Sequence, residues 1–107
     1  MKLWIDDVRN PPGTLSEGWI WITEVNAAKR YITIMEQGAE KGHEGIELID
    51  IDHDAGDFAS EGGDYIKLLD WLEETGRNYP IRIHSQNVVG RMNMEAICRR
   101  NGWKIVE

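Results

Sequence analysis

Short runs of apolar residues alternate along the chain with longer segments in which apolar residues recur every three or four positions. The first pattern is typical of strands buried in a sheet, and the second is typical of helices with one buried face. The runs predict strands over residues 2–6, 19–22, 46–52, 81–85 and 103–106. The periodic segments predict helices bounded by Thr23 and Gly38, by Asp64 and Gly76, and by Asn87 and Gly102. The last helix is expected to bury Val89, Met92, Ala96 and Ile97.

Two connecting segments have no strand or helix pattern. Residues 8–18 contain Pro11-Pro12 followed by Gly13, which excludes a regular helix through the middle of this connection. Residues 53–63 are polar and rich in glycine, a composition that fits a lid over a ligand as well as an ordinary loop.

The alternation of strands and helices also predicts the fold. Strands joined by helices form right-handed units, so we expect a mostly parallel, five-stranded sheet with about three helices covering both faces. This is a flavodoxin-like three-layer α/β sandwich formed by a single domain of residues 1–107. In the strand order 2-1-3-4-5, ligands bind at the carboxyl ends of the central strands. Three adjacent strands end there in polar residues, which are Asp6-Asp7, Asp52-His53-Asp54 and His84-Ser85-Gln86-Asn87.

Composition narrows the possible partners. The 107 residues carry a net charge of −7, which argues against binding of long duplex nucleic acid and leaves a small phosphorylated ligand or an RNA end. No apolar run is long enough to span a membrane, and the first residues have no signal-peptide character. We therefore expect a cytoplasmic protein without a membrane partner, acting as a monomer or weak dimer. The single Cys98 leaves no internal disulfide.

Carboxylates dominate the shared edge of the sheet. Asp6, Asp7 and Asp52 offer the oxygen ligands that Mg²⁺ or Mn²⁺ prefers, and such an ion would let an anionic phosphate approach. Asp54 is a further candidate ligand, although Asp is also common in turns that have no function. Loop carboxylates that only face water or cap helices would give the same sequence, so both interpretations stay open.

Hydroxyl, imidazole and guanidinium groups adjoin these carboxylates. Ser85 and Asn87 could hold phosphate oxygens at a helix start, or could serve only to begin that helix. His84 and His53 could act as acid and base on a cyclic ester, or could be hydrogen-bonded at strand ends without any catalytic role. Arg9 could clamp a phosphate, or could simply be exposed.

Motifs in this order are similar to those of a known family. Asp6-Asp7 after the first strand, Asp52 after the third and Ser85 after the fourth resemble the receiver domains of bacterial response regulators. The segments LWIDDVRNPPG, GWIWITE, IDHDAGD and IHSQNVVGRMNMEAI look like the cyclic-phosphate processing receiver family. The receiver resemblance implies Mg²⁺ held by Asp6, Asp7 and Asp52. It also places Asp52 at the phosphoacceptor position and Ser85 at the switch hydroxyl.

The chain also departs from ordinary receivers. Lys104 comes too early to be the lysine that receivers place after their fifth strand, and a Pro-Pro loop replaces the first helix. The last receiver helix is expected to be missing. The extra His53 and His84 suit the handling of a cyclic phosphate, such as the 2′,3′-cyclic ends left by RNA cleavage.

Three functions follow as hypotheses. The first is a metal-assisted phosphoesterase for cyclic nucleotides or RNA 2′,3′-cyclic phosphate ends, in which Asp52 or a water held by the ion attacks and His84 moves the proton. The second is an atypical receiver that accepts phosphate at Asp52 and signals through Ser85 without turnover. The third is a Toprim-like metal-dependent nuclease, suggested by Asp50-x-Asp52 and disfavoured because the first strand ends in Asp6-Asp7 rather than Glu.

Overall fold

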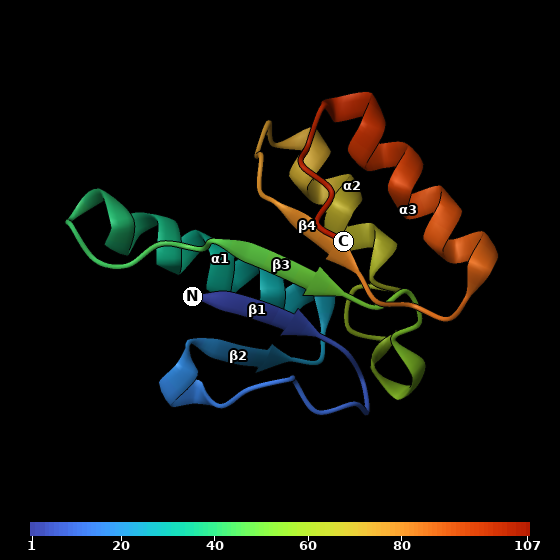
Figure 1. Cartoon of the computed structure of the whole chain (residues 1–107), viewed down its shortest axis with the longest axis horizontal. Coiled ribbons are helices and arrows are strands. Elements are labelled where there is room, and N and C mark those ends of the chain that lie inside the picture. Colours follow the sequence, from blue (N-terminus) through green and yellow to red (C-terminus); the bar gives the residue numbers. More distant parts are fainter.

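The computed structural model describes residues 1–107 and contains four strands, three α-helices and two short 3-10 helices (Figure 1). The strands are β1 (Lys2–Ile5), β2 (Trp19–Ile22), β3 (Leu48–Ile51) and β4 (Ile81–Ile83). The α-helices are α1 (Val25–Glu40), α2 (Ile66–Glu74) and α3 (Val88–Asn101). The 3-10 helices are η1 (Leu15–Glu17) and η2 (Gly56–Phe58). No helix combines the length and the apolar character that a membrane span needs.

The sheet is parallel throughout and has the order β2-β1-β3-β4. Leu3 of β1 lies in register with Ile20 of β2 and Ile49 of β3, so apolar side chains are aligned across the sheet. This confirms the receiver-like α/β fold and the predicted order of the first four strands.

The predicted fifth strand, over residues 103–106, does not form. Ile105 makes an isolated parallel bridge with Ile81, the first residue of β4, and no longer pairing follows. The reason lies in how α3 ends: Gly102 adopts a left-handed conformation, and the N–H of Trp103 donates to the carbonyl of Cys98 as part of the helix cap. Because Trp103 belongs to the cap, the chain meets β4 only beyond it, where Ile81 contacts Lys104 and Ile105.

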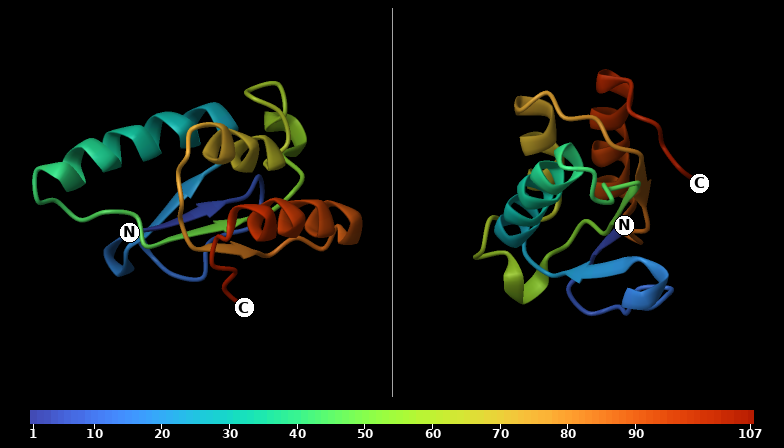
Figure 2. Two further views of the ribbon diagram at one scale, coloured as in Figure 1. Left: turned by 90° about the horizontal axis from the view of Figure 1, so that it is seen from above. Right: turned by 90° about the vertical axis from the view of Figure 1, so that its left-hand side faces the viewer.

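All three α-helices lie on one side of the sheet, so the expected covering of both faces was wrong (Figure 2). The connections from β2 to β3 and from β3 to β4 advance in the same direction across the sheet, and right-handed connections then place their helices on the same face. The buried core lies between this face and the helices, and includes Leu3, Ile5, Ile49, Ile51, Ile81 and Ile83.

The opposite face of the sheet is covered by the irregular segment between β1 and β2. This connection joins two parallel strands, where a helix would normally cover the sheet, but its prolines prevent a helix there. Its Arg9 carbonyl accepts a hydrogen bond of 2.8 Å from the indole N–H of Trp4. Gly13 lies so close to Trp19 that an added Cβ would be 2.6 Å from the indole ring. Tryptophans and a short loop therefore replace a helical layer.

The buried face of α3 also differs from the prediction. Ile97 is buried as expected, whereas Val89 and Met92 are exposed by 70% and 61% and Ala96 is also exposed. Gly90, Met94 and Cys98 face the interior instead. The helix is rotated so that Gly90 can approach the ring of His53, which leaves the bulkier neighbours in solvent.

Candidate functional site

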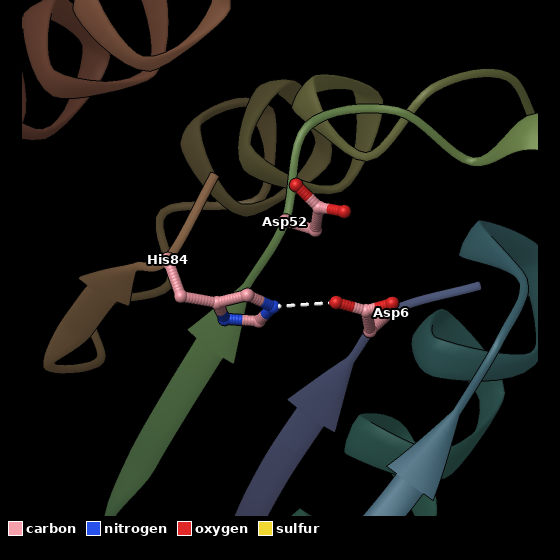
Figure 3. Close-up of side chains that lie close together, drawn as sticks. All are labelled: Asp6, Asp52 and His84. Carbon is pink, nitrogen blue, oxygen red and sulfur yellow. Dashed lines mark hydrogen bonds and ion pairs between the residues drawn. The ribbon is translucent and has the colours of Figure 1, made fainter. Parts of the chain in front are cut away.

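Three side chains from separate strands converge at the carboxyl edge of the sheet (Figure 3). Asp6 follows β1, Asp52 follows β3 and His84 follows β4, and one ligand atom of each lies within 4.8 Å of the others. The backbone N–H of each residue continues the hydrogen bonding of the sheet, to the carbonyls of Ile22, Ile5 and Ile51 respectively. The sheet itself therefore positions this group, as the polar strand ends indicated.

His84 is held between two buried carboxylates. Its Nδ1 lies 2.7 Å from Oδ1 of Asp50, and its Nε2 lies 2.8 Å from Oδ2 of Asp6. The imidazole stacks in parallel on the indole of Trp4, with 3.9 Å between ring centroids. Burial alone would lower the pKa of His84, but the hydrogen bonds and charges of Asp50 and Asp6 outweigh it and raise the pKa. Both ring nitrogens of His84 thus face carboxylate oxygens, an arrangement that favours the protonated form of the imidazole.

Asp50 is a site residue that the strand-end argument did not single out. It lies within β3, is 1% exposed, and its second oxygen is 3.7 Å from the guanidinium of Arg82. The signal was present in the sequence, because a charged residue between Ile49 and Ile51 interrupts an otherwise apolar strand and needs a buried partner. The partner of Asp50 could not be predicted from the sequence, since the side chain of His84 crosses over β3 to contact it (Figure 3).

Asp6 is completely buried and fully hydrogen-bonded. Its Oδ1 accepts from the backbone N–H groups of Val8 at 2.9 Å and Arg9 at 2.8 Å, while Oδ2 faces His84. Burial would raise the pKa of Asp6, but these backbone donors and His84 lower it below its ordinary value. Asp6 is thus a fixed anion, and the guanidinium of Arg9 stands 4.0 Å from it.

Asp7 and Asp52 carry charge that no side chain of the protein neutralises. Burial and the negative charges of Asp6 and Asp52 raise the pKa of Asp7, which lies against Gly56. Asp52 is 6% exposed; its Oδ1 accepts from the N–H of His53, and neither carboxylate makes an ion pair. Carboxylate oxygens are the ligands that Mg²⁺ or Mn²⁺ prefers, and those of Asp6 and Asp52 lie close enough to share one ion, whereas Asp7 lies beside them but outside this group.

Asp54 and His53, both predicted site residues, belong to a second group with Asp64. The Nδ1 of His53 lies 2.9 Å from Asp54, and the ring packs against Gly90 of α3. Asp64 accepts a hydrogen bond from the N–H of Ala55, which holds the loop after β3. The structure therefore separates Asp54 and His53 from the group of Asp6, Asp52 and His84.

Ser85 and Asn87 shape the start of α3. The side-chain oxygen of Asn87 accepts from the N–H of Gly90 at 2.9 Å, which confirms that Asn87 caps the helix. Ser85 is 5% exposed, and its hydroxyl oxygen accepts from the N–H of Asn87 at 3.1 Å. The hydroxyl proton of Ser85 is still free to donate. Arg9 is about half exposed and donates to the carbonyl of His84 at 3.3 Å, so its guanidinium borders the same edge.

The two pockets of the structure lie away from the carboxyl edge. A pocket of about 290 Å³ lies between α3 and the last residues of the chain, and one of about 360 Å³ lies on the outer surface of α1 and α2. Neither is lined by Asp6, Asp7, Asp52 or Ser85. Neither pocket would therefore enclose a ligand bound at this edge.

A parallel α/β sheet with buried aspartates at the ends of its central strands defines a receiver-like domain. The chain belongs to the cyclic-phosphate processing receiver domain family, whose model matches residues 1–100. Comparison with curated proteins found no match, and neither did comparison with solved structures.

Proposed function

We propose that this domain is a metal-assisted phosphoesterase that opens a cyclic phosphate, such as a 2′,3′-cyclic nucleotide or RNA end. The family supports the cyclic phosphate as the substrate class. The observation that carries the proposal is the contrast between two sets of carboxylates. Asp6 and Asp50 both pair with His84, whereas Asp7 and Asp52 beside them make no ion pair.

The carboxylates at this edge would hold the ion. Asp6, Asp7 and Asp52 would bind Mg²⁺ or Mn²⁺, which when bound would polarise the phosphoryl oxygens and offset their charge. Ser85 and Arg9 would contact the same phosphate, because a hydroxyl proton and a guanidinium stand at this edge. Asn87 would orient Ser85 through its backbone N–H.

Proton transfer would be divided between Asp52 and His84. Asp52 would accept a proton from the attacking water through its Oδ2, which accepts no hydrogen bond in the structure. As the new P–O bond forms, one ring P–O bond breaks, and His84 would donate its Nε2 proton to the departing ribose oxygen. Asp50 would keep the emerging neutral imidazole in place through Nδ1. His53 is given no step, because it lies in the second group.

Hydrolysis of 2′,3′-cyclic AMP with Mn²⁺ or Mg²⁺ tests the proposal. We expect wild-type turnover to a nucleoside monophosphate, and a loss of at least about a hundredfold in Asp52→Asn and His84→Gln. Asp57→Asn is the matched control, because Asp57 is exposed and belongs to neither group of metal-capable side chains. Equal turnover by wild type and Asp52→Asn would refute the assignment.

An atypical receiver without turnover is the second candidate. It is favoured by the place of Asp52 at the end of β3 and of buried Ser85 at the end of β4. Acetyl phosphate should then label Asp52, and Asp52→Asn should remain unlabelled. The family match lends no support to the Toprim-like nuclease.

A further inference from the structure

Trp21 is the one aromatic side chain of the chain that is exposed. It is 41% exposed, whereas Trp4 and Trp103 are 9% and 6% exposed and the other aromatic side chains are at least half-buried. Exposure of so large an apolar ring is unfavourable in water, and such rings mark binding surfaces more often than smaller apolar residues do.

The ring of Trp21 is fixed beside the carboxylate site. Trp21 pairs in register with Trp4 on β1, and its indole N–H donates a hydrogen bond of 2.8 Å to the carbonyl of Asp6. The same Asp6 provides the buried carboxylate of the site. The indole therefore has its polar atom satisfied, and what it presents to solvent is apolar ring surface on the same side of the sheet as Trp4, its partner in register.

We propose that the exposed surface of Trp21 is a stacking platform for the nucleobase of the substrate; this rests on the proposed function. Only one sugar separates the base of a nucleotide from its phosphate, which matches a ring held next to Asp6. Neither pocket of the structure lies at this edge, so the ring of Trp21 is the exposed apolar surface beside the site. A net charge of −7 disfavours a polynucleotide backbone but does not oppose stacking of one base. The substrate class is therefore a terminal nucleotide rather than an internal stretch of nucleic acid.

Equilibrium binding separates this proposal from the turnover it rests on. Dissociation constants for 3′-AMP and for glycerol 2-phosphate, which has no base, are measured by calorimetry in Mn²⁺ with the full chain. We expect Trp21→Ala to weaken 3′-AMP binding about tenfold and to leave glycerol 2-phosphate unchanged, while Trp21→Phe retains most of the affinity. Ile34→Ala is the matched control, because Ile34 is an exposed apolar residue on α1.

Each outcome has one meaning. Equal weakening of both ligands, or of neither, in Trp21→Ala would overturn the stacking role. Absence of wild-type turnover with retained selectivity for 3′-AMP through Trp21 would overturn the proposed function alone. If sedimentation shows that Trp21→Ala converts a dimer to a monomer without changing 3′-AMP affinity, the ring serves a contact between two copies and the proposal fails. Native near-ultraviolet circular dichroism of Trp21→Phe establishes that the fold is intact.

Discussion

Asp50 and His84 form the most constrained pair of side chains in the protein. A buried carboxylate is costly unless it is paired, and His84 provides the partner for both Asp50 and Asp6. The parallel stack on Trp4 closes one face of the imidazole. The imidazole of His84 is therefore fixed between two buried carboxylates.

Removal of one anion should lower the pKa of His84. In Asp50→Asn the imidazolium loses its charged partner at Nδ1, so its raised pKa should fall, as measured by NMR titration of the ring. His43, an exposed histidine in the loop after α1, is the internal control. An unchanged His84 titration in Asp50→Asn would contradict the pairing.

The same pair determines a pH dependence of stability in the metal-free protein. Because the pKa of His84 is raised above 6.5 on folding, its contribution is complete below that pH and is lost as the pH rises through the folded-state pKa. The free energy of unfolding of wild type should therefore fall as the pH rises from 6.5 through the folded-state pKa of His84. Urea unfolding of Asp50→Asn should show a flatter profile.

The sequence predicted that Asp6, Asp52 and His84 lie together, but not that His84 pairs with Asp50. Asp6, Asp52 and His84 were placed correctly because the carboxyl ends of adjacent parallel strands must lie together. Asp54 was grouped with them because it is two residues from Asp52, yet the chain turns after β3 and directs its side chain toward His53. Such a turn depends on loop conformation, which residue type and spacing do not determine.

The start of α3 connects the helix to the loop that carries His53. Asn87 caps the helix, and its amide also approaches Asp54 at 3.4 Å. Asn87→Ala should lower the free energy of unfolding by about 1 kcal/mol, because the N–H of Gly90 loses its acceptor. Urea denaturation gives the value, and Asn87→Ser, which can still cap, should lose less. Equal losses in the two variants would argue that the cap is unimportant.

The effect of Gly90→Ala on stability should change sign when the ring of His53 is removed. An added Cβ would lie 2.5 Å from the ring of His53, so Gly90→Ala should destabilise the fold by about 1–3 kcal/mol despite the better helix propensity of Ala. In a His53→Ala background the same change should become stabilising. Thermal unfolding of the four proteins measures this, and two effects of the same sign would contradict the packing.

This contact also explains why sequence reasoning misplaced the buried face of α3. Apolar periodicity favoured Val89 and Met92 because it counts side chains by hydrophobicity. The close approach of a histidine ring to a glycine carries no hydrophobic signal, so the rotation of the helix could not be predicted from the pattern.

The molecule as a whole has helices on one face of its sheet and tryptophans with a loop on the other. Pro11-Pro12 were correctly taken to exclude a regular helix through the middle of the connection between β1 and β2, which contains only the short η1. The consequence of this for the layers was not predicted. Because the remaining crossovers all advance in one direction, their helices lie on one face and none covers the second. The short third layer is what leaves Trp21 exposed beside the site.

The negative charges at the carboxyl edge of the sheet predict that the order of stability of wild type and Asp52→Asn reverses when Mn²⁺ is added. In chelator, Asp52→Asn should be more stable than wild type, because it removes repulsion with Asp7 while keeping an acceptor for the N–H of His53. With Mn²⁺ at about one hundred times its dissociation constant, wild type should gain about 2.7 kcal/mol and the variant little. Thermal unfolding measures both conditions.

Asp54→Asn is the matched control for this inversion. It removes one carboxylate from the second group and should keep the full gain from Mn²⁺. If Asp54→Asn loses the gain and Asp52→Asn keeps it, the ion binds at the second group instead.

Anomalous scattering from crystals grown with Mn²⁺ and 3′-AMP would locate the ion. We expect one strong peak contacting the carboxylates of Asp6, Asp7 and Asp52, with the phosphate of the nucleotide beside it. A peak at His53, Asp54 and Asp64, or no peak with the nucleotide bound, would contradict this expectation.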